Sequence, residues 1–225
     1  MNYFAHGRNF TDDPYLLAGT AVPDWLGVVD RRVKARSQSA LGLVEDDDER
    51  VASVARGIVQ HHHDDNWFHQ TRAFAELSLS FTASIRRVLS DDDGLRPRFV
   101  GHILVELLLD AALIEEDGRR LDHYYQAIQA VDAQVVESTV NRIARRSTSH
   151  LATMIRLFAE SRFLFDYQSD ERLLYRLNQV MCRVGLPAIP EEFVRLLPET
   201  RRQVRQRREE LLAGEGAPRQ AGCDC

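Results

Sequence analysis

The sequence predicts an all-α protein, a single-domain helical bundle. Apolar residues recur every three or four positions through most of the 225-residue chain, as at Phe74, Leu77, Phe81 and Ile85, which is the spacing of one helix face. No segment alternates apolar and polar residues as a half-buried strand does. A chain of this length can bury one core without disulfide support. We therefore expect one helical domain over residues 1–213 and a flexible tail over 214–225.

The expected helices are separated by breaks rich in Gly, Pro and Asp. The chain opens with an ordered N-terminal segment, and an apolar stretch follows at residues 16–22. Residues 34–49 are polar, and we expect a mobile loop there. Helical periodicity then marks segments at 49–72, 74–88, 97–116, 124–135, 151–158 and 173–184.

Composition limits the classes of function. A formal charge of −5 leaves no broad basic surface, so nucleic acid is not expected as a partner. The three cysteines, two of them in the tail at Cys223 and Cys225, form no disulfide framework and favour a reducing compartment. The apolar run at residues 99–114 is too short to cross a bilayer, and no secretory signal opens the chain. We expect a cytoplasmic protein with no membrane span.

Two of the expected helices carry ionisable residues on an otherwise apolar face. Each face has three of them at four-residue spacing: His61, Asp65 and His69 on the earlier helix, and His102, Glu106 and Asp110 on the later one. Residues at this spacing lie on one side of a helix. Burying such groups costs several kcal/mol each unless they are paired, protonated or bound to a metal. We therefore expect the two helices to pack together around a metal site.

The donor types indicate which metals would fit. Mixed imidazole and carboxylate ligands suit Mn, Fe, Zn or Mg, and no cysteine lies near these positions. Glu106 or Asp110 could instead act as a general base. The adjacent pair His63 and Asp64 is a reserve candidate, because metal-dependent phosphohydrolases of the HD type use such a dyad. A buried network of ion pairs without a metal is the structural alternative.

Three further polar positions lie near the N-terminus. Asn2 and His6 stand among apolar residues, and Asp24 follows Pro23 after an apolar stretch. Asp24 could cap a helix or contribute a carboxylate to the site.

Four segments carry motifs in a specific order. Residues 2–6 read N-Y-F-A-H, and residues 16–25 read L-L-A-G-T-A-V-P-D-W. Residues 57–65 follow G-I-x-x-H-x-x-x-D, and residues 105–111 read V-E-L-L-L-D-A. In order and spacing they resemble the acyl carrier protein phosphodiesterase family, whose corresponding motifs are N-F-L-A-H, L-x-G-N-L-L-A-D-F, G-I-x-x-H-x-x-x-D-x-x-x-D and V-D-x-x-x-D-H. The resemblance covers roughly the first half of the chain.

The resemblance implies a helical fold distantly related to HD phosphohydrolases and a divalent metal, manganese foremost. It implies that a metal-activated water hydrolyses the phosphodiester joining phosphopantetheine to a carrier-protein serine, or a comparable small phosphodiester. In the first case holo acyl carrier protein is the partner. The expected metal ligands are His61, Asp65, His69, His102, Glu106 and Asp110. The expected catalytic carboxylates are Asp24, Glu106 and Asp110. Asn2, His6 and Asp64 are expected to support the ligands from behind.

The chain departs from the family pattern at three positions. His69 and Glu106 each stand where the family has Asp, and Ala111 stands where it has His, while His102 is an additional donor. A zinc-dependent hydrolase of the phospholipase C type is a second expectation. A non-enzymatic helical binding module with a buried His and carboxylate network is the third.

Overall fold

The computed structural model describes residues 1–88, 94 and 96–214, and these residues form helices with no strand. The all-α prediction is therefore confirmed. In chain order the α-helices are α1 (Tyr3–Gly7), α2 (Pro14–Val29), α3 (Ser37–Ala40), α4 (Glu49–Gln70), α5 (Arg72–Val88), α6 (Pro97–Glu116), α7 (Gly118–Gln129), α8 (Ala133–Ile143), α9 (Leu151–Ser161), α10 (Asp170–Arg183), α11 (Leu197–Gln206) and α12 (Arg208–Leu211). Short 3-10 helices are η1 (Leu41–Leu43), η2 (Phe163–Gln168) and η3 (Glu191–Leu196).

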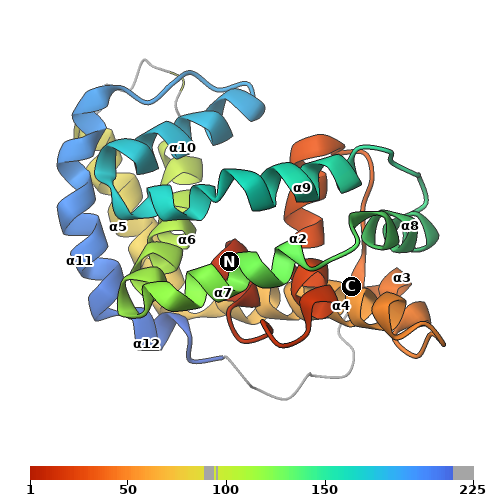
Figure 1. Ribbon diagram of the computed structural model, residues 1–225. Coiled ribbons are helices and arrows are strands. Elements are labelled where there is room, and N and C mark those ends of the chain that lie inside the picture. The colour runs from red at the N-terminus through yellow and green to blue at the C-terminus, as the bar shows by residue number, and fades with distance from the viewer. Residues whose placement is uncertain (89–93, 95, 215–225) are drawn as a thin grey trace.

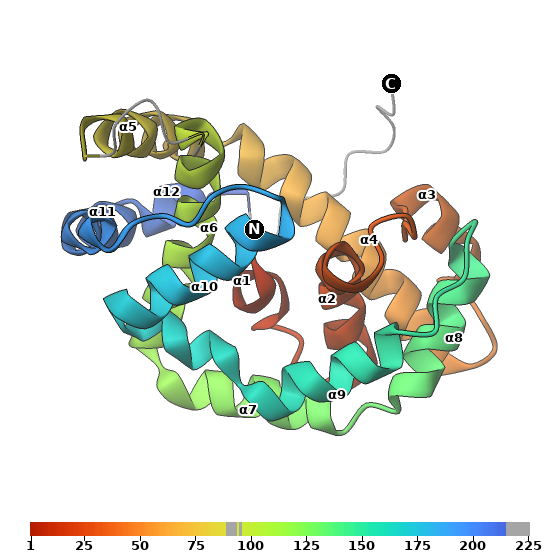
Figure 2. The ribbon, with the colours of Figure 1, turned by 90° about the horizontal axis from the view of Figure 1, so that it is seen from above.

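The short helix α1 lies in the middle of the molecule. Figure 2 shows it between α2 and α6, with α7, α9 and α10 along one side. The helix contacts α2, α6 and α7, and its residues Tyr3 and Phe4 are buried. Nearly all buried apolar residues of the described chain, from Met1 to Leu211, form one hydrophobic cluster. The N-terminal segment is thus part of the core, where it can contribute side chains to a buried site.

Helices α2 and α4 cross at two glycines, Gly19 and Gly57. A Cβ on Gly57 would lie 2.7 Å from the Cα of Gly19, and a Cβ on Gly19 would lie 2.9 Å from the Cα of Gly57. Asp13 strengthens the same contact, because its carboxylate caps α2 at the Leu16 amide and accepts the Ser53 hydroxyl of α4 at 2.9 Å. The absence of side chains at the crossing lets the two backbones approach closely.

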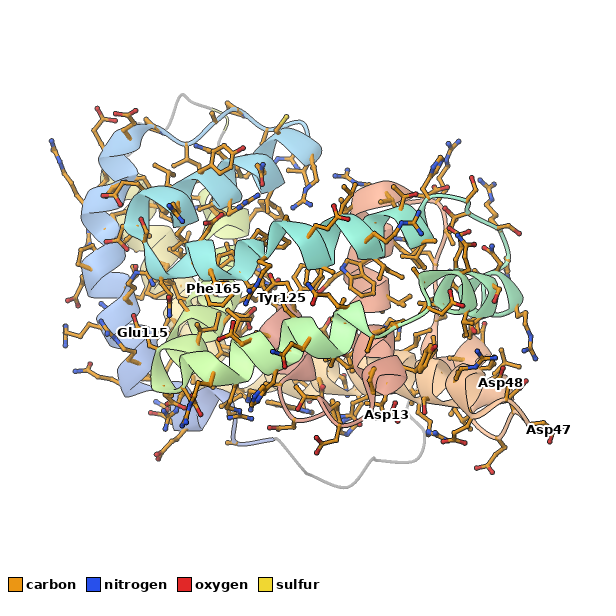
Figure 3. The ribbon with its side chains drawn as sticks, viewed as in Figure 1. Asp13, Asp47, Asp48, Glu115, Tyr125 and Phe165 are labelled. Carbon is orange, nitrogen blue, oxygen red and sulfur yellow. The ribbon has the colours of Figure 1, made fainter. Side chains whose placement is uncertain are left out.

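Aromatic contacts position the 3-10 helix η2. Tyr125 of α7 and Phe165 of η2 are labelled next to each other in Figure 3, and their rings stack with centroids 6.1 Å apart. The Leu164 amide donates a hydrogen bond of 3.0 Å to the Tyr125 hydroxyl. These contacts hold η2 against α6, and Tyr167 at its end faces the N-terminal residues.

The predicted helices at 49–72 and 97–116 are confirmed as α4 and α6. The expectation that they pack along each other is wrong. Helix α4 packs mainly on α2, and α6 packs mainly on α5 (Figure 1). Helices α4 and α6 meet near one end of α4, where His69 contacts Glu106. Local periodicity identifies an apolar face but not the helix that covers it.

The expected mobile loop at residues 34–49 is corrected as well. It contains α3 and η1, and the side chains of Ala35 and Ala40 are buried. Asp48 caps α4 by accepting the Arg50 amide at 3.0 Å, and Asp47 and Asp48 lie at the outer edge of the molecule (Figure 3). The tail at 215–225, with Cys223 and Cys225, and the break at 89–93 lie outside the described residues. Among the helices described, none is long and apolar enough to span a membrane.

Candidate metal centre

The structure brings the predicted residues together in two groups. The first is His6, His61 and Asp65, and the second is His69, His102 and Glu106. Within each group, one potential ligand atom per residue lies within 4.8 Å of the others. Five of the six expected ligands are present in the two groups; Asp110 lies outside both, and His6, expected behind the ligands, belongs to the first.

In the first group, both histidines are held through their Nδ1 atoms. The Nδ1 of His61 lies 2.8 Å from the carbonyl oxygen of Thr20, and the Nδ1 of His6 lies 3.3 Å from a carboxylate oxygen of Asp64. Each Nδ1 faces an acceptor and therefore carries the proton. In the neutral imidazoles this leaves the two Nε2 lone pairs free, which is the arrangement that protein metal sites use to orient histidine ligands.

Both Nε2 atoms face the carboxylate of Asp65. The Nε2 of His61 lies 3.4 Å from Asp65 Oδ2, and that of His6 lies 3.3 Å from Oδ1. The buried His6 Nε2 has no hydrogen-bond partner within the described part of the chain. Two neutral imidazole lone pairs facing a carboxylate repel it unless a cation lies between them or both rings are protonated. The first group therefore fits a bound cation.

The geometry of α2 supports the first group. The close crossing at Gly19 and Gly57 brings the Thr20 carbonyl to His61, one turn further along α4. Pro23 removes a helical hydrogen bond from this turn of α2. The rings of His6 and His61 stack with centroids 4.2 Å apart, so α1 and α4 present their imidazoles side by side.

In the second group, two imidazole nitrogens contact the same carboxylate oxygen. The Nε2 of His69 lies 2.9 Å and the Nε2 of His102 lies 3.2 Å from Glu106 Oε1. The side chain of Glu106 is 13% exposed, whereas that of His102 is 40% exposed. This group is thus open on one side. It suits either a metal ion that also binds water, or a metal-free arrangement in which the two histidines donate N–H hydrogen bonds to Glu106.

The α-amino nitrogen of Met1 lies between the two groups. It donates to Asp65 Oδ1 at 2.5 Å and lies 3.7 Å from Glu106 Oε1. Because one nitrogen contacts both carboxylates, the two groups are neighbours and belong to one centre. Burial opposes the charged amine, but the charges of Glu106 and Asp65 outweigh it and raise the pKa of the Met1 amine.

The charges in the centre favour ionised carboxylates. Burial alone would raise the pKa of Asp65, but its contacts with His6 and His61 and the charge of the Met1 amine hold that pKa well below its ordinary value. Glu106 behaves in the same way, and the Met1 amine with His102 and His69 lowers its pKa to about 2. Burial likewise disfavours charged His61, yet Asp65 and Asp24 raise the pKa of His61. Both carboxylates are therefore in the form that binds cations.

Asp24 lies inside α2 rather than at a helix end, so it does not cap a helix. Its carboxylate lines a pocket of about 450 Å³ that also reaches Met1, Asn2 and Glu106. Burial raises the pKa of Asp24, while the nearby charges of His61 and His6 lower it in part. Asp24 thus lies close to the imidazoles of the first group.

Asp110 is fully buried and holds the first turn of α1. Its carboxylate accepts the amides of Phe4 at 3.0 Å and Ala5 at 2.7 Å, and the side-chain amide of Asn2 at 2.9 Å. Asn2 also donates to the Tyr167 hydroxyl at 3.2 Å. Burial raises the pKa of Asp110 to about 7 despite these donors, which favour its charged form. Asp110 thus supports the segment that carries His6.

The remaining residues of the histidine run have separate contacts. The Nε2 of His62 lies 2.8 Å from the Ala35 carbonyl oxygen, away from the centre. Asp64 is buried and accepts hydrogen bonds from Gln60 and Trp67 besides its contact with His6. His63 lies 3.7 Å from Asp64 and belongs to neither group. Asp64 thus contacts the Nδ1 side of His6.

Sequence reasoning did not find three contributors to the site. The Thr20 carbonyl oxygen and the Met1 nitrogen are backbone atoms, so the residue types in the sequence do not reveal their roles. Arg183, which lines the pocket beside Asp24, lies far along the chain in an ordinary amphipathic helix. Only the tertiary contacts identify them.

Comparisons with protein-family models, with curated proteins and with solved structures find no match for this chain. The resemblance to acyl carrier protein phosphodiesterases therefore stays a prediction. What the geometry supplies is an all-α protein with His and carboxylate groups that could hold a metal ion, next to an open pocket.

Proposed function

We propose that this protein is a metal-dependent phosphodiesterase similar to the acyl carrier protein phosphodiesterases. The observation that carries the proposal is the first group, where two buried imidazoles with fixed Nδ1 protons direct their Nε2 atoms at one carboxylate. A neighbouring second group and an open pocket accompany it. This combination supports a metal centre that a substrate can reach.

The proposed ligands are His6, His61 and Asp65, with His69, His102 and Glu106 for a second ion or for outer contacts. Imidazole and carboxylate donors suit manganese, and also iron, zinc or magnesium. When bound, such an ion lowers the pKa of water and neutralises charge on phosphoryl oxygens.

Asp24 is the carboxylate available for proton transfer. It lines the pocket, and no hydrogen bond occupies it within the described part of the chain. In the proposed reaction the water oxygen attacks phosphorus while Asp24 accepts the water proton. The ester P–O bond then breaks, and Asp24 returns the proton to the leaving oxygen, which departs as an alcohol. Holo acyl carrier protein or a smaller phosphodiester is the proposed substrate.

The non-enzymatic alternative has its own supporting observation. The Met1 amine and the histidines already pair with Asp65 and Glu106, so the centre can close as a network of ion pairs without a metal. Metal content separates the two proposals, because a closed network binds no ion at stoichiometric level.

The decisive experiment measures metal content and hydrolysis together. Untagged protein from manganese-supplemented cells is analysed by elemental mass spectrometry, then stripped with chelator and assayed with bis(4-nitrophenyl) phosphate after adding each metal. Holo acyl carrier protein is tested next by the mass lost with phosphopantetheine. We expect near-stoichiometric metal and metal-dependent hydrolysis, both abolished in His61→Ala and retained in the neighbouring control His62→Ala. Protein that binds no metal and hydrolyses no phosphodiester would overturn the proposal.

A further inference from the structure

The pocket beside the centre has an apolar wall and a cationic rim. Its floor is formed by Met1, Asn2 and Tyr3 together with Asp24 and Glu106. Its walls come from α2, α6, α9, η2 and α10, and the four α-helices among them surround α1 in Figure 2. The arrangement joins a polar floor at the candidate metal centre to an apolar channel that leads outward.

The apolar side chains continue to the surface. Phe158 is buried in the wall, whereas Leu157 of α9 is 56% exposed and Val184, just after α10, is 38% exposed. Large apolar side chains exposed at the edge of a pocket are typical of binding sites, because they gain from being covered. The wall is therefore suited to an apolar arm that extends from the floor towards the surface.

Arg183 supplies an uncompensated positive charge to this pocket. Its guanidinium has no carboxylate partner and no hydrogen bond within residues 1–88, 94 and 96–214, unlike Arg176, which pairs with Asp166 at 2.7 Å. Burial raises the pKa of Tyr3 and Tyr167, and the charge of Arg183 opposes this in part, so the exposed guanidinium at the rim acts on the floor of the pocket. Arg31 donates to the Arg183 carbonyl oxygen and holds the end of α10 in place.

An unpaired guanidinium beside an apolar wall favours one class of ligand. Arginine binds phosphate or carboxylate through two parallel N–H donors, and burial of alkyl groups adds affinity in proportion to their area. The ligand therefore combines an anionic head with an apolar arm.

We propose that this pocket binds an amphipathic phosphoester, with its phosphoryl oxygens on Arg183 and its alkyl or acyl arm along Phe158, Leu157 and Val184. The choice of phosphate as the anion rests on the proposed function; the anionic head and the apolar arm rest on the pocket itself. A phosphodiester that bears such an arm is then the preferred substrate, with its phosphorus between Arg183 and the candidate metal ligands.

The test measures binding rather than turnover. Methyl, butyl and hexyl phosphate are titrated calorimetrically into the full chain, with and without Mn²⁺. We expect affinity to rise about two- to fourfold for each added methylene. Arg183→Gln should weaken binding of all three probes about tenfold or more, and Leu157→Asn should flatten the dependence on chain length. Arg156→Gln, an exposed arginine of α9 that does not line the pocket, is the matched control and should bind as wild type does.

Two further probes define the head and the source of the ligand. Hexanoate should bind more weakly than hexyl phosphate, and equal binding would overturn the choice of phosphate. Vesicles of phosphatidylcholine and phosphatidylglycerol show whether the ligand is a membrane lipid or a free ester. Co-sedimentation of the protein with vesicles that is lost in Arg183→Gln assigns the phosphate head to a lipid. No co-sedimentation of the wild type assigns it to a free ester.

Failure of this inference is distinguishable from failure of the proposed function. Affinities that do not change with chain length, or that survive Arg183→Gln, overturn the pocket assignment even if the protein hydrolyses phosphodiesters. If the protein binds the probes through Arg183 with affinities that depend on chain length, but holds no metal and hydrolyses no phosphodiester, the pocket assignment stands and the proposed phosphodiesterase function is overturned.

Discussion

Replacing Asp110 by alanine should destabilise the protein rather than merely remove a ligand. Its carboxylate accepts the buried amides of Phe4 and Ala5, and alanine leaves both without a partner. Each orphaned buried donor costs about 1–3 kcal/mol, so we expect a loss of about 2–6 kcal/mol near pH 5. That is a large share of the roughly 5–15 kcal/mol by which domains are stable. The Asn2 amide keeps its contact with Tyr167 and adds little to the loss.

The effect depends on pH with a definite sign. Burial raises the pKa of native Asp110 from 3.8 to about 7, so between these values the native protein holds a proton that the unfolded chain has lost. Raising the pH through this window therefore destabilises the wild type relative to the alanine variant. Between pH 5 and pH 8 the advantage of the wild type should shrink by about 2–3 kcal/mol.

Urea unfolding followed by circular dichroism measures both effects, with metal removed from all samples. Asp110→Asn is the matched variant, because its amide keeps one acceptor oxygen and does not titrate; it should lose less stability, and the loss should not depend on pH through this group. Metal content of the folded variants is measured separately. An alanine variant as stable as the wild type but depleted of metal would refute the anchoring role and make Asp110 a ligand, as the stripe on α6 suggested.

Other predictions address the centre and its support. Asp65→Ala should remove bound metal, seen by elemental analysis, while far-ultraviolet circular dichroism stays unchanged; retained metal would exclude Asp65 as a ligand. Asp64→Asn, which alters the partner of the His6 Nδ1, should weaken metal affinity about 10- to 100-fold in a chelator competition, and an unchanged affinity would contradict its role. Gly57→Ala should cost about 1–3 kcal/mol in urea unfolding because its Cβ meets α2, whereas Gly118→Ala, with open space around it, should be neutral; equal effects would contradict the close crossing.

The sequence by itself determined the helices and the faces that carry chemistry. The periodicity of residues 49–72 and 97–116 predicted α4 and α6 closely, since buried stripes at helical spacing leave few other conformations. The ionisable residues on those stripes were visible because apolar neighbours surround them. Their types also indicated a metal, since imidazole and carboxylate donors are rarely buried without a partner.

Only the tertiary structure decided which of these residues share a site. Residues eight apart on a helix differ in direction by about 80°, because each residue turns by about 100°. His61 and His69 therefore belong to different groups, and Asp110 faces α1 while His102 faces α4. The crossing of α2 and α4, the insertion of α1 into the core, and the position of Arg183 depend on contacts between segments far apart in the chain. No local pattern contains them, because side-chain spacing fixes a helix face and not its neighbour.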